Sequence, residues 1–266
     1  MNEYLSLWIF AATISLVAGC TTNPITGKTE LMLLSEDQDI EIGRQYAPEI
    51  EKQMGGKIPD QALQNYINIV GQKIARVSHN QSFKYQFAAL HDKSVNAFAL
   101  PGGYIFITKG MLQNLQTEAQ LAGILAHEIV HVVARDVANA MSTQIGIDLL
   151  LSAVKSEETS QTALTVAQLG TQIMSLRFSR TDEKEADLGG LDYIFAAGYN
   201  PYGLVESMEM LAAQSQERPI EFLSTHPAPE DRSAYLKQSI MTKQFSLANT
   251  KIGKEEYKTT VLSRLN

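Results

Sequence analysis

Apolar residues recur every three to four positions along much of the chain, and this period predicts amphipathic helices. In residues 59–77, for example, Leu63, Ile67, Val70 and Ile74 share one helical face. From this period and from capping residues, helices are predicted over residues 35–52, 59–77, 117–141, 143–176 and 180–198, with two more after Asn200-Pro201 and after residues 225–232.

Three short segments have instead the aromatic and β-branched residues that are typical of strands. They are residues 85–90 (YQFAAL), 96–103 (NAFALPGG, with a turn at its end) and 104–108 (YIFIT). No internal repeat and no second core is evident. We therefore expect one α+β, mainly helical domain over residues 35–245, which contains a small β-sheet. A polar C-terminal tail over residues 246–266 would follow it.

Composition supports a single globular domain and argues against one class of binding partner. The chain has 266 residues, of which 44% are hydrophobic and 19% charged, and this balance suits a protein with a sizeable core. The formal net charge is -7 and no basic cluster is present, which argues against a nucleic-acid partner. The single cysteine excludes an intramolecular disulfide.

The amino terminus carries an apolar run at residues 4–19 that ends directly before Cys20. The run is short for a membrane span and has the character of a secretory signal. A buried core helix is the alternative. The ending LVAGC resembles the bacterial lipobox, which implies a signal peptide over 1–19, acylation of Cys20 and a tether over 20–34. Thr21, in place of an Asp, favours the outer membrane.

The run from Leu121 to Asp136 places His127, Glu128 and His131 among apolar residues. Residues four apart lie one above the other on a helix, so both imidazoles can bind one zinc ion. Glu128 is turned by about 100° from His127, where it can reach a metal-bound water. This is the physical content of the HExxH pattern. Two satisfied core histidines would be the simpler explanation, but an uncompensated buried carboxylate is costly.

A catalytic zinc needs a third protein ligand and one open position. In the stretch SRTDEKEADLGG, the candidates are Asp182, Glu183, Glu185 and Asp187. Glu183 and Asp187 share one helical face, so either can bind zinc while the other orients a ligand histidine. A solvated acidic face is the alternative. Gly189 and Gly190 would let this helix approach the HExxH helix.

HExxH followed at a distance by SRTDEKEAD resembles the gluzincin zinc metallopeptidases of the HtpX and BepA type, which include the CAAX prenyl-protein endopeptidases. The likeness extends to NPITGKTELMLLSEDQDIEIG, NAFALPGGYIFITKGML and STHPAPEDR, and it is closest to the bacterial lipoprotein branch. The resemblance implies a zincin-like domain, with Glu183 as third zinc ligand, Asp187 as the orienting residue and Glu185 as a bystander.

The same resemblance implies roles for residues elsewhere in the chain. His226 and Arg232 would lie at the active-site cleft as catalytic residues. His226 would stabilise an oxyanion or occupy the open zinc position. Asn96, Ala97 and Phe98 would bind substrate as an added strand. His79 and His91, outside any motif, are expected to be ordinary surface residues.

The expected protein is thus a zinc metalloendopeptidase with one Zn²⁺ per chain, anchored in the periplasm through Cys20. Zinc would activate a water molecule, from which Glu128 takes the proton. Its substrates would be misfolded or membrane-associated envelope proteins of the periplasm or outer membrane. An assembly factor acting with the outer-membrane machinery, and a zinc hydrolase of non-peptide bonds, are the alternatives.

Overall fold

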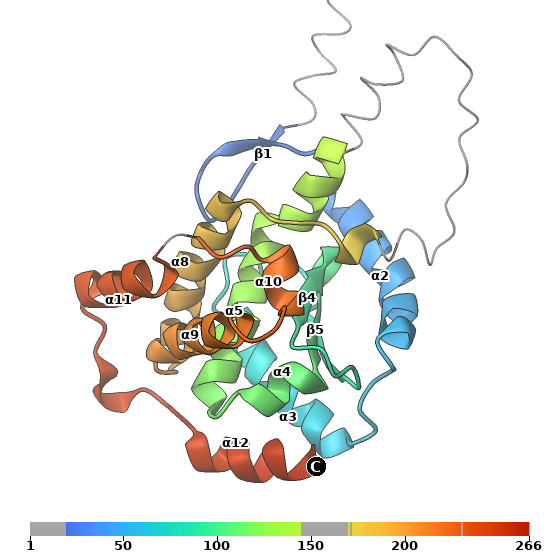
Figure 1. The fold of residues 1–266 in the computed structure, drawn as a ribbon. Coiled ribbons are helices and arrows are strands. Elements are labelled where there is room, and N and C mark those ends of the chain that lie inside the picture. Colours follow the sequence, from blue (N-terminus) through green and yellow to red (C-terminus); the bar gives the residue numbers. More distant parts are fainter. Residues whose placement is uncertain (1–19, 145–169, 171, 230, 266) are drawn as a thin grey trace, which may run out of the picture.

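The computed structural model describes residues 20–144, 170, 172–229 and 231–265 (Figure 1). The predicted signal peptide over residues 1–19 and most of the helical segment predicted over 143–176 lie outside the described residues. Within the described part, no helix combines the length and the hydropathy that crossing a bilayer requires.

A three-stranded sheet stands beside the central helix α5 (Figure 1). Its strands are β3 (Gln86–Leu90), β4 (Ala97–Leu100) and β5 (Tyr104–Thr108). The middle strand β5 runs parallel to β3 and antiparallel to β4. Its side chains alternate between two cores, because Ile105 and Ile107 face the larger core and Phe106 the smaller one. The three predicted strands are confirmed.

Helices surround this sheet and supply most of the fold. They are α2 (Glu36–Gln53), α3 (Gln61–Ala75), α4 (Lys109–Asn114), α5 (Glu118–Ala134), α8 (Arg180–Ala196), α9 (Tyr202–Ser215), α10 (Glu221–Thr225), α11 (Arg232–Lys243) and α12 (Lys254–Thr260), with short 3-10 turns η1 (Pro101–Gly103), η2 (Leu247–Asn249) and η3 (Leu262–Arg264). The predicted α+β, mainly helical class is confirmed.

Helix α5, which carries the HExxH sequence, is buried along its whole length. The sheet, α3, α8 and α9 all contact it. Helix α9 comes especially close, since a Cβ atom on Gly203 would lie 2.3 Å from the carbonyl oxygen of Ala119. A polar side chain on α5 without a partner inside the protein is therefore costly.

Helix α5 ends at Ala134, although the sequence predicts one helix to about Met141. Arg135 has left-handed backbone angles, φ 60° and ψ 34°, and it terminates the helix. Helical residues resume at 136 and continue to 144. The prediction of a continuous helix is wrong because nothing in the local sequence, such as a glycine, marks this left-handed position.

The predicted polar tail over residues 246–266 is also wrong. Helix α12 and the residues after it pack on the domain, with the side chains of Tyr257, Val261 and Leu265 buried in the larger core. These three residues are spaced four apart in the sequence, although α12 itself ends at Thr260 and the 3-10 turn η3 follows it. The charged residues between them conceal that spacing in the composition.

The residues of the predicted tether, 20–34, largely form a docked hairpin. Strand β1 (Cys20–Thr22) pairs antiparallel with β2 (Thr29–Leu31). The Nζ atom of Lys28 lies 2.8 Å from Oε1 of Glu185 in α8. The hairpin pairs its backbone internally and contacts the domain, while the predicted role of residues 20–34 as a tether from Cys20 stays a prediction. Cys20 itself is exposed.

Candidate metal centre

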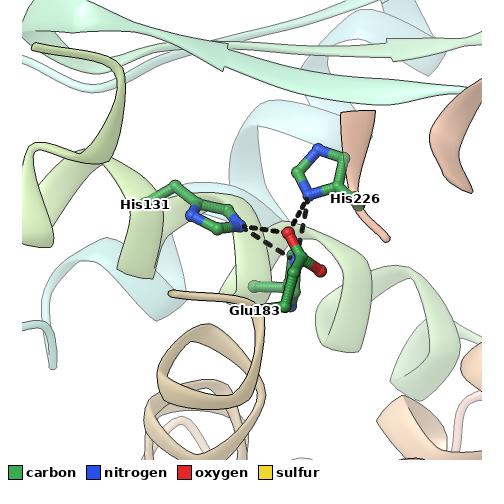
Figure 2. A group of neighbouring side chains, drawn as sticks. His131, Glu183 and His226 are labelled. Carbon is green, nitrogen blue, oxygen red and sulfur yellow. Dashed lines mark hydrogen bonds and ion pairs between the residues drawn. The ribbon is translucent and has the colours of Figure 1, made fainter. Parts of the chain in front are cut away.

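Four buried side chains from three segments of the chain bring their ligand atoms together: His127, His131, Glu183 and His226. Figure 2 shows His131, Glu183 and His226 pointing toward one another. The Nε2 atoms of His127 and His131 are 3.1 Å apart, and each is 3.5 Å from a carboxylate oxygen of Glu183. The Nδ1 atom of His226 lies 3.4 Å from Nε2 of His127 and 2.8 Å from Oε1 of Glu183.

These separations suit a zinc ion. With bonds of about 2.0–2.1 Å, a tetrahedral zinc holds its ligand atoms about 3.3 Å apart. Imidazole nitrogen and carboxylate oxygen are both ordinary zinc ligands. The structure thus brings together the three predicted ligands and places His226 beside them as a fourth donor, one of the two roles expected for it.

Each imidazole on α5 contacts a carboxylate through Nδ1, the ring nitrogen that faces away from the donor cluster. The Nδ1 atom of His127 is 3.1 Å from Oδ1 of Asp187, and that of His131 is 2.6 Å from Oδ2 of Asp136. A carboxylate accepts the Nδ1 proton and leaves Nε2 unprotonated and free to bind metal. Asp187 thus lies where the sequence expects an orienting residue.

Arg232 contacts the carboxylates of α8. Its Nε and Nη2 atoms donate to the two oxygens of Asp187, at 2.7 Å each, and Nη2 lies 3.2 Å from Oε2 of Glu183. Burial alone would raise the pKa of Asp187, but the guanidinium charge holds that pKa below its usual value. Burial opposes ionisation of Glu183 as well, yet His226 and His127 hold its pKa well below normal. Both carboxylates are therefore ionised at neutral pH.

Glu128 lies beside the donor cluster without hydrogen bonds. Its side chain is fully buried, and among the described residues neither carboxylate oxygen has a hydrogen-bond partner. Nε2 of His226 lies 3.8 Å from Oε1 of Glu128. A buried carboxylate in this state is costly unless it has a reaction partner or a nearby cation. The unpartnered carboxylate fits a site that binds zinc and water.

Two aromatic rings cover the histidines. Phe178 stacks on His131 with ring centroids 4.2 Å apart, and Phe222 stacks on His226 at 4.3 Å. The backbone N–H of Phe178 donates to the carbonyl oxygen of Thr225 at 3.1 Å. The segment before α8 and the last residue of α10 are thus joined next to the donor cluster.

The predicted substrate strand is an edge of the sheet. Among the described strands, β4 pairs only with β5. Asn96 comes just before β4, and Asn96, Ala97 and Phe98 are all buried. Phe98 packs against Phe106 in the smaller core. Their role in substrate binding stays a prediction.

The sequence reasoning missed Asp136, Phe178 and Tyr235. Tyr235 donates a hydrogen bond to Asp187, and its position three residues after Arg232 was the available signal. Asp136 was concealed by the assumption of a continuous helix. His79 and His91 are exposed, as expected.

The comparisons with known proteins agree with this site. The sequence profile of Peptidase family M48 matches residues 61–240. The chain is similar to the Beta-barrel assembly-enhancing protease of Escherichia coli (strain K12), with 33% identity over 85% of this chain and 50% of the relative. It is also similar to the Mitochondrial metalloendopeptidase OMA1 of Arabidopsis thaliana, with 31% identity over 62% of this chain and 33% of the relative. Its identity with the Metalloprotease LoiP of Escherichia coli (strain K12) is 29% over 54% of this chain and 58% of the relative.

The chain spans about half the length of the first of these relatives. The family profile covers well over half of the chain, and the expected resemblance is confirmed at the level of the family. The chain belongs to Peptidase family M48, whose members are zinc-dependent metallopeptidases.

Proposed function

We propose that this chain is a zinc metalloendopeptidase that cleaves misfolded or membrane-associated proteins of the bacterial envelope. The observation that carries the proposal is the cluster of four donors with the unpartnered Glu128 carboxylate beside it. The names of the Beta-barrel assembly-enhancing protease and the Metalloprotease LoiP support proteolysis, and the former supports an envelope substrate.

His127, His131 and Glu183 would hold the metal. When bound, zinc polarises a carbonyl oxygen and acidifies water. Glu128 accepts the proton of the attacking water, since its oxygens have no competing hydrogen bonds, and delivers it to the leaving amine. Asp187 and Arg232 act as positioning residues, because they contact the ligands and one another.

His226 faces both the donors and the base. Its Nδ1 atom lies within the donor cluster, and its Nε2 atom lies 3.8 Å from Oε1 of Glu128. We propose that His226 would help to hold the metal through Nδ1, and that its imidazole would stabilise the oxyanion of the scissile carbonyl when substrate is bound.

Glu128→Gln tests the mechanism with an almost isosteric change. The variant should bind one zinc per chain, measured by elemental analysis, and should cleave unfolded casein at least 100-fold more slowly. Glu185→Gln is the matched control, because Glu185 lies on α8 without contacting the donor cluster, and it should cleave normally. Undiminished cleavage by Glu128→Gln would refute the mechanism.

For localisation, we propose that Cys20 is acylated and anchors the protein to the periplasmic face of the outer membrane. The lipobox-like sequence before Cys20 and the exposure of this residue support the proposal. Cys20→Ala should move the protein from the membrane fraction to the soluble fraction and abolish palmitate labelling. Continued membrane association would contradict the anchor.

A role in outer-membrane assembly is the second candidate, and the printed name of the Beta-barrel assembly-enhancing protease favours it. The two functions separate in the same Glu128→Gln variant. If assembly depends on proteolysis, envelope proteins should accumulate bound to the inactive variant. Normal assembly with the inactive variant would assign that role to a non-proteolytic activity.

A further inference from the structure

We propose that Asp136 is a positioning residue for the zinc ligand His131, and that the left-handed residue Arg135 places it there. The inference deepens the proposed function and rests on its metal site. It assigns the second HExxH histidine a carboxylate partner of its own, as Asp187 is the partner of the first.

The contact is short and buried. Oδ2 of Asp136 lies 2.6 Å from Nδ1 of His131, in side chains that are 7% and 0% exposed. The opposite nitrogen, Nε2, faces His127 and Glu183. Because the carboxylate accepts the Nδ1 proton, it fixes the tautomer and the ring orientation that present Nε2 to a metal.

A continuous helix could not make this contact. Five residues along an α-helix correspond to a rotation of about 500°, so Asp136 would be turned about 140° away from His131. The left-handed Arg135 interrupts α5 instead and returns the chain toward the histidine. The break in the helix therefore brings the carboxylate of Asp136 to the imidazole of His131.

The break is held by a second set of contacts. Nε of Arg135 lies 2.6 Å from Oδ2 of Asp39 in α2, and Nη2 donates to the carbonyl oxygen of Leu34 at 2.7 Å. The left-handed conformation costs a residue other than glycine roughly 1–2 kcal/mol. A glycine would avoid that cost but would lack both contacts, so the arginine side chain ties the amino-terminal segment to the bend beside the metal site.

The surroundings of Asp136 let its role be tested without collapse of the core. The residue lines a polar cavity of about 600 Å³, together with Thr143 and Glu185. Truncation at Asp136 enlarges a cavity that is already open to solvent. It therefore does not create a closed void in the core, which would lower the stability of the protein. Phe178 stacks on the face of the His131 ring, and its side chain cannot form a hydrogen bond with either ring nitrogen. The hydrogen bond from Nδ1 is the contact that truncation removes.

The test measures zinc affinity directly, by competition with a chromogenic chelator. Asp136→Ala should weaken zinc binding by roughly 10–100-fold. Asp136→Asn keeps an oxygen acceptor for the Nδ1 proton and should recover part of that loss. Glu185→Ala, a carboxylate change on the wall of the same cavity, should bind zinc like the wild type. Cobalt substitution gives a second readout, since the absorption bands of bound cobalt should shift in Asp136→Ala.

The outcomes separate this inference from the proposed function. If the wild type binds zinc and Asp136→Ala binds it equally well with unshifted cobalt bands, the inference is wrong and the metal site stands. If the wild type binds no zinc, both fail. Should Asp136→Ala not fold, Asp136→Asn alone decides, because an amide accepts more weakly than a carboxylate. Unchanged zinc affinity in Asp136→Asn would then overturn the inference.

Discussion

Tyr257 provides a direct test of whether the carboxy-terminal residues belong to the core. Its side chain is fully buried in the larger core, and its hydroxyl donates to the carbonyl oxygen of Leu112 at 2.7 Å. An aromatic side chain buries about 150–250 Å², which at ~25 cal/mol per Å² corresponds to about 4–6 kcal/mol as an upper bound. Since alanine retains part of that area, Tyr257→Ala should lower the free energy of unfolding by about 3–5 kcal/mol.

The measurement is urea denaturation followed by far-UV circular dichroism. Tyr257→Phe removes only the hydroxyl and should cost about 1 kcal/mol. Lys258→Ala is the control, because Lys258 is exposed on the same helix, and a surface change should fall within about 0.5 kcal/mol of the wild type. If Tyr257→Ala also stayed within that range, the carboxy-terminal residues would be the polar tail that the sequence suggests.

The remaining predictions concern the metal, the buried carboxylates and the helix contact. Removal of zinc by a chelator should abolish casein cleavage and lower the melting temperature, and added zinc should restore both, because the metal binds only the folded state. Asp187→Ala should weaken zinc binding roughly 10–100-fold in the chelator competition. Burial alone would raise the pKa of Glu118, but Lys251 and two tyrosines hold it below normal. This carboxylate stabilises the fold above its unfolded pKa of about 4.3, and its contribution is lost as the pH falls through the lowered pKa. Glu118→Gln should therefore reduce the fall in unfolding free energy between about pH 6 and about pH 3. Gly203→Ala should cost roughly 1–3 kcal/mol in urea denaturation, because its Cβ would lie 2.3 Å from the backbone carbonyl oxygen of Ala119 in α5.

Local sequence patterns were enough to predict the strands, most helices and the metal-binding chemistry. The spacing of four between His127 and His131 depends only on helical geometry. The same spacing marked Glu183 and Asp187 as a pair but left open which one binds the metal. In the structure the Glu183 oxygens lie among the imidazole nitrogens and Asp187 lies behind His127, an arrangement that supports Glu183 as the proposed ligand.

Tertiary structure alone decided the features that depend on contacts between distant segments. A left-handed arginine has no sequence signature, and Arg135 is held in that conformation by Asp39, nearly one hundred residues earlier. The contact between Asp136 and His131 follows from that bend. The placement of His226 beside Glu183 likewise requires α8 and α10 to meet at α5. Periodicity along one segment determines which residues share a face, whereas only packing determines what that face meets.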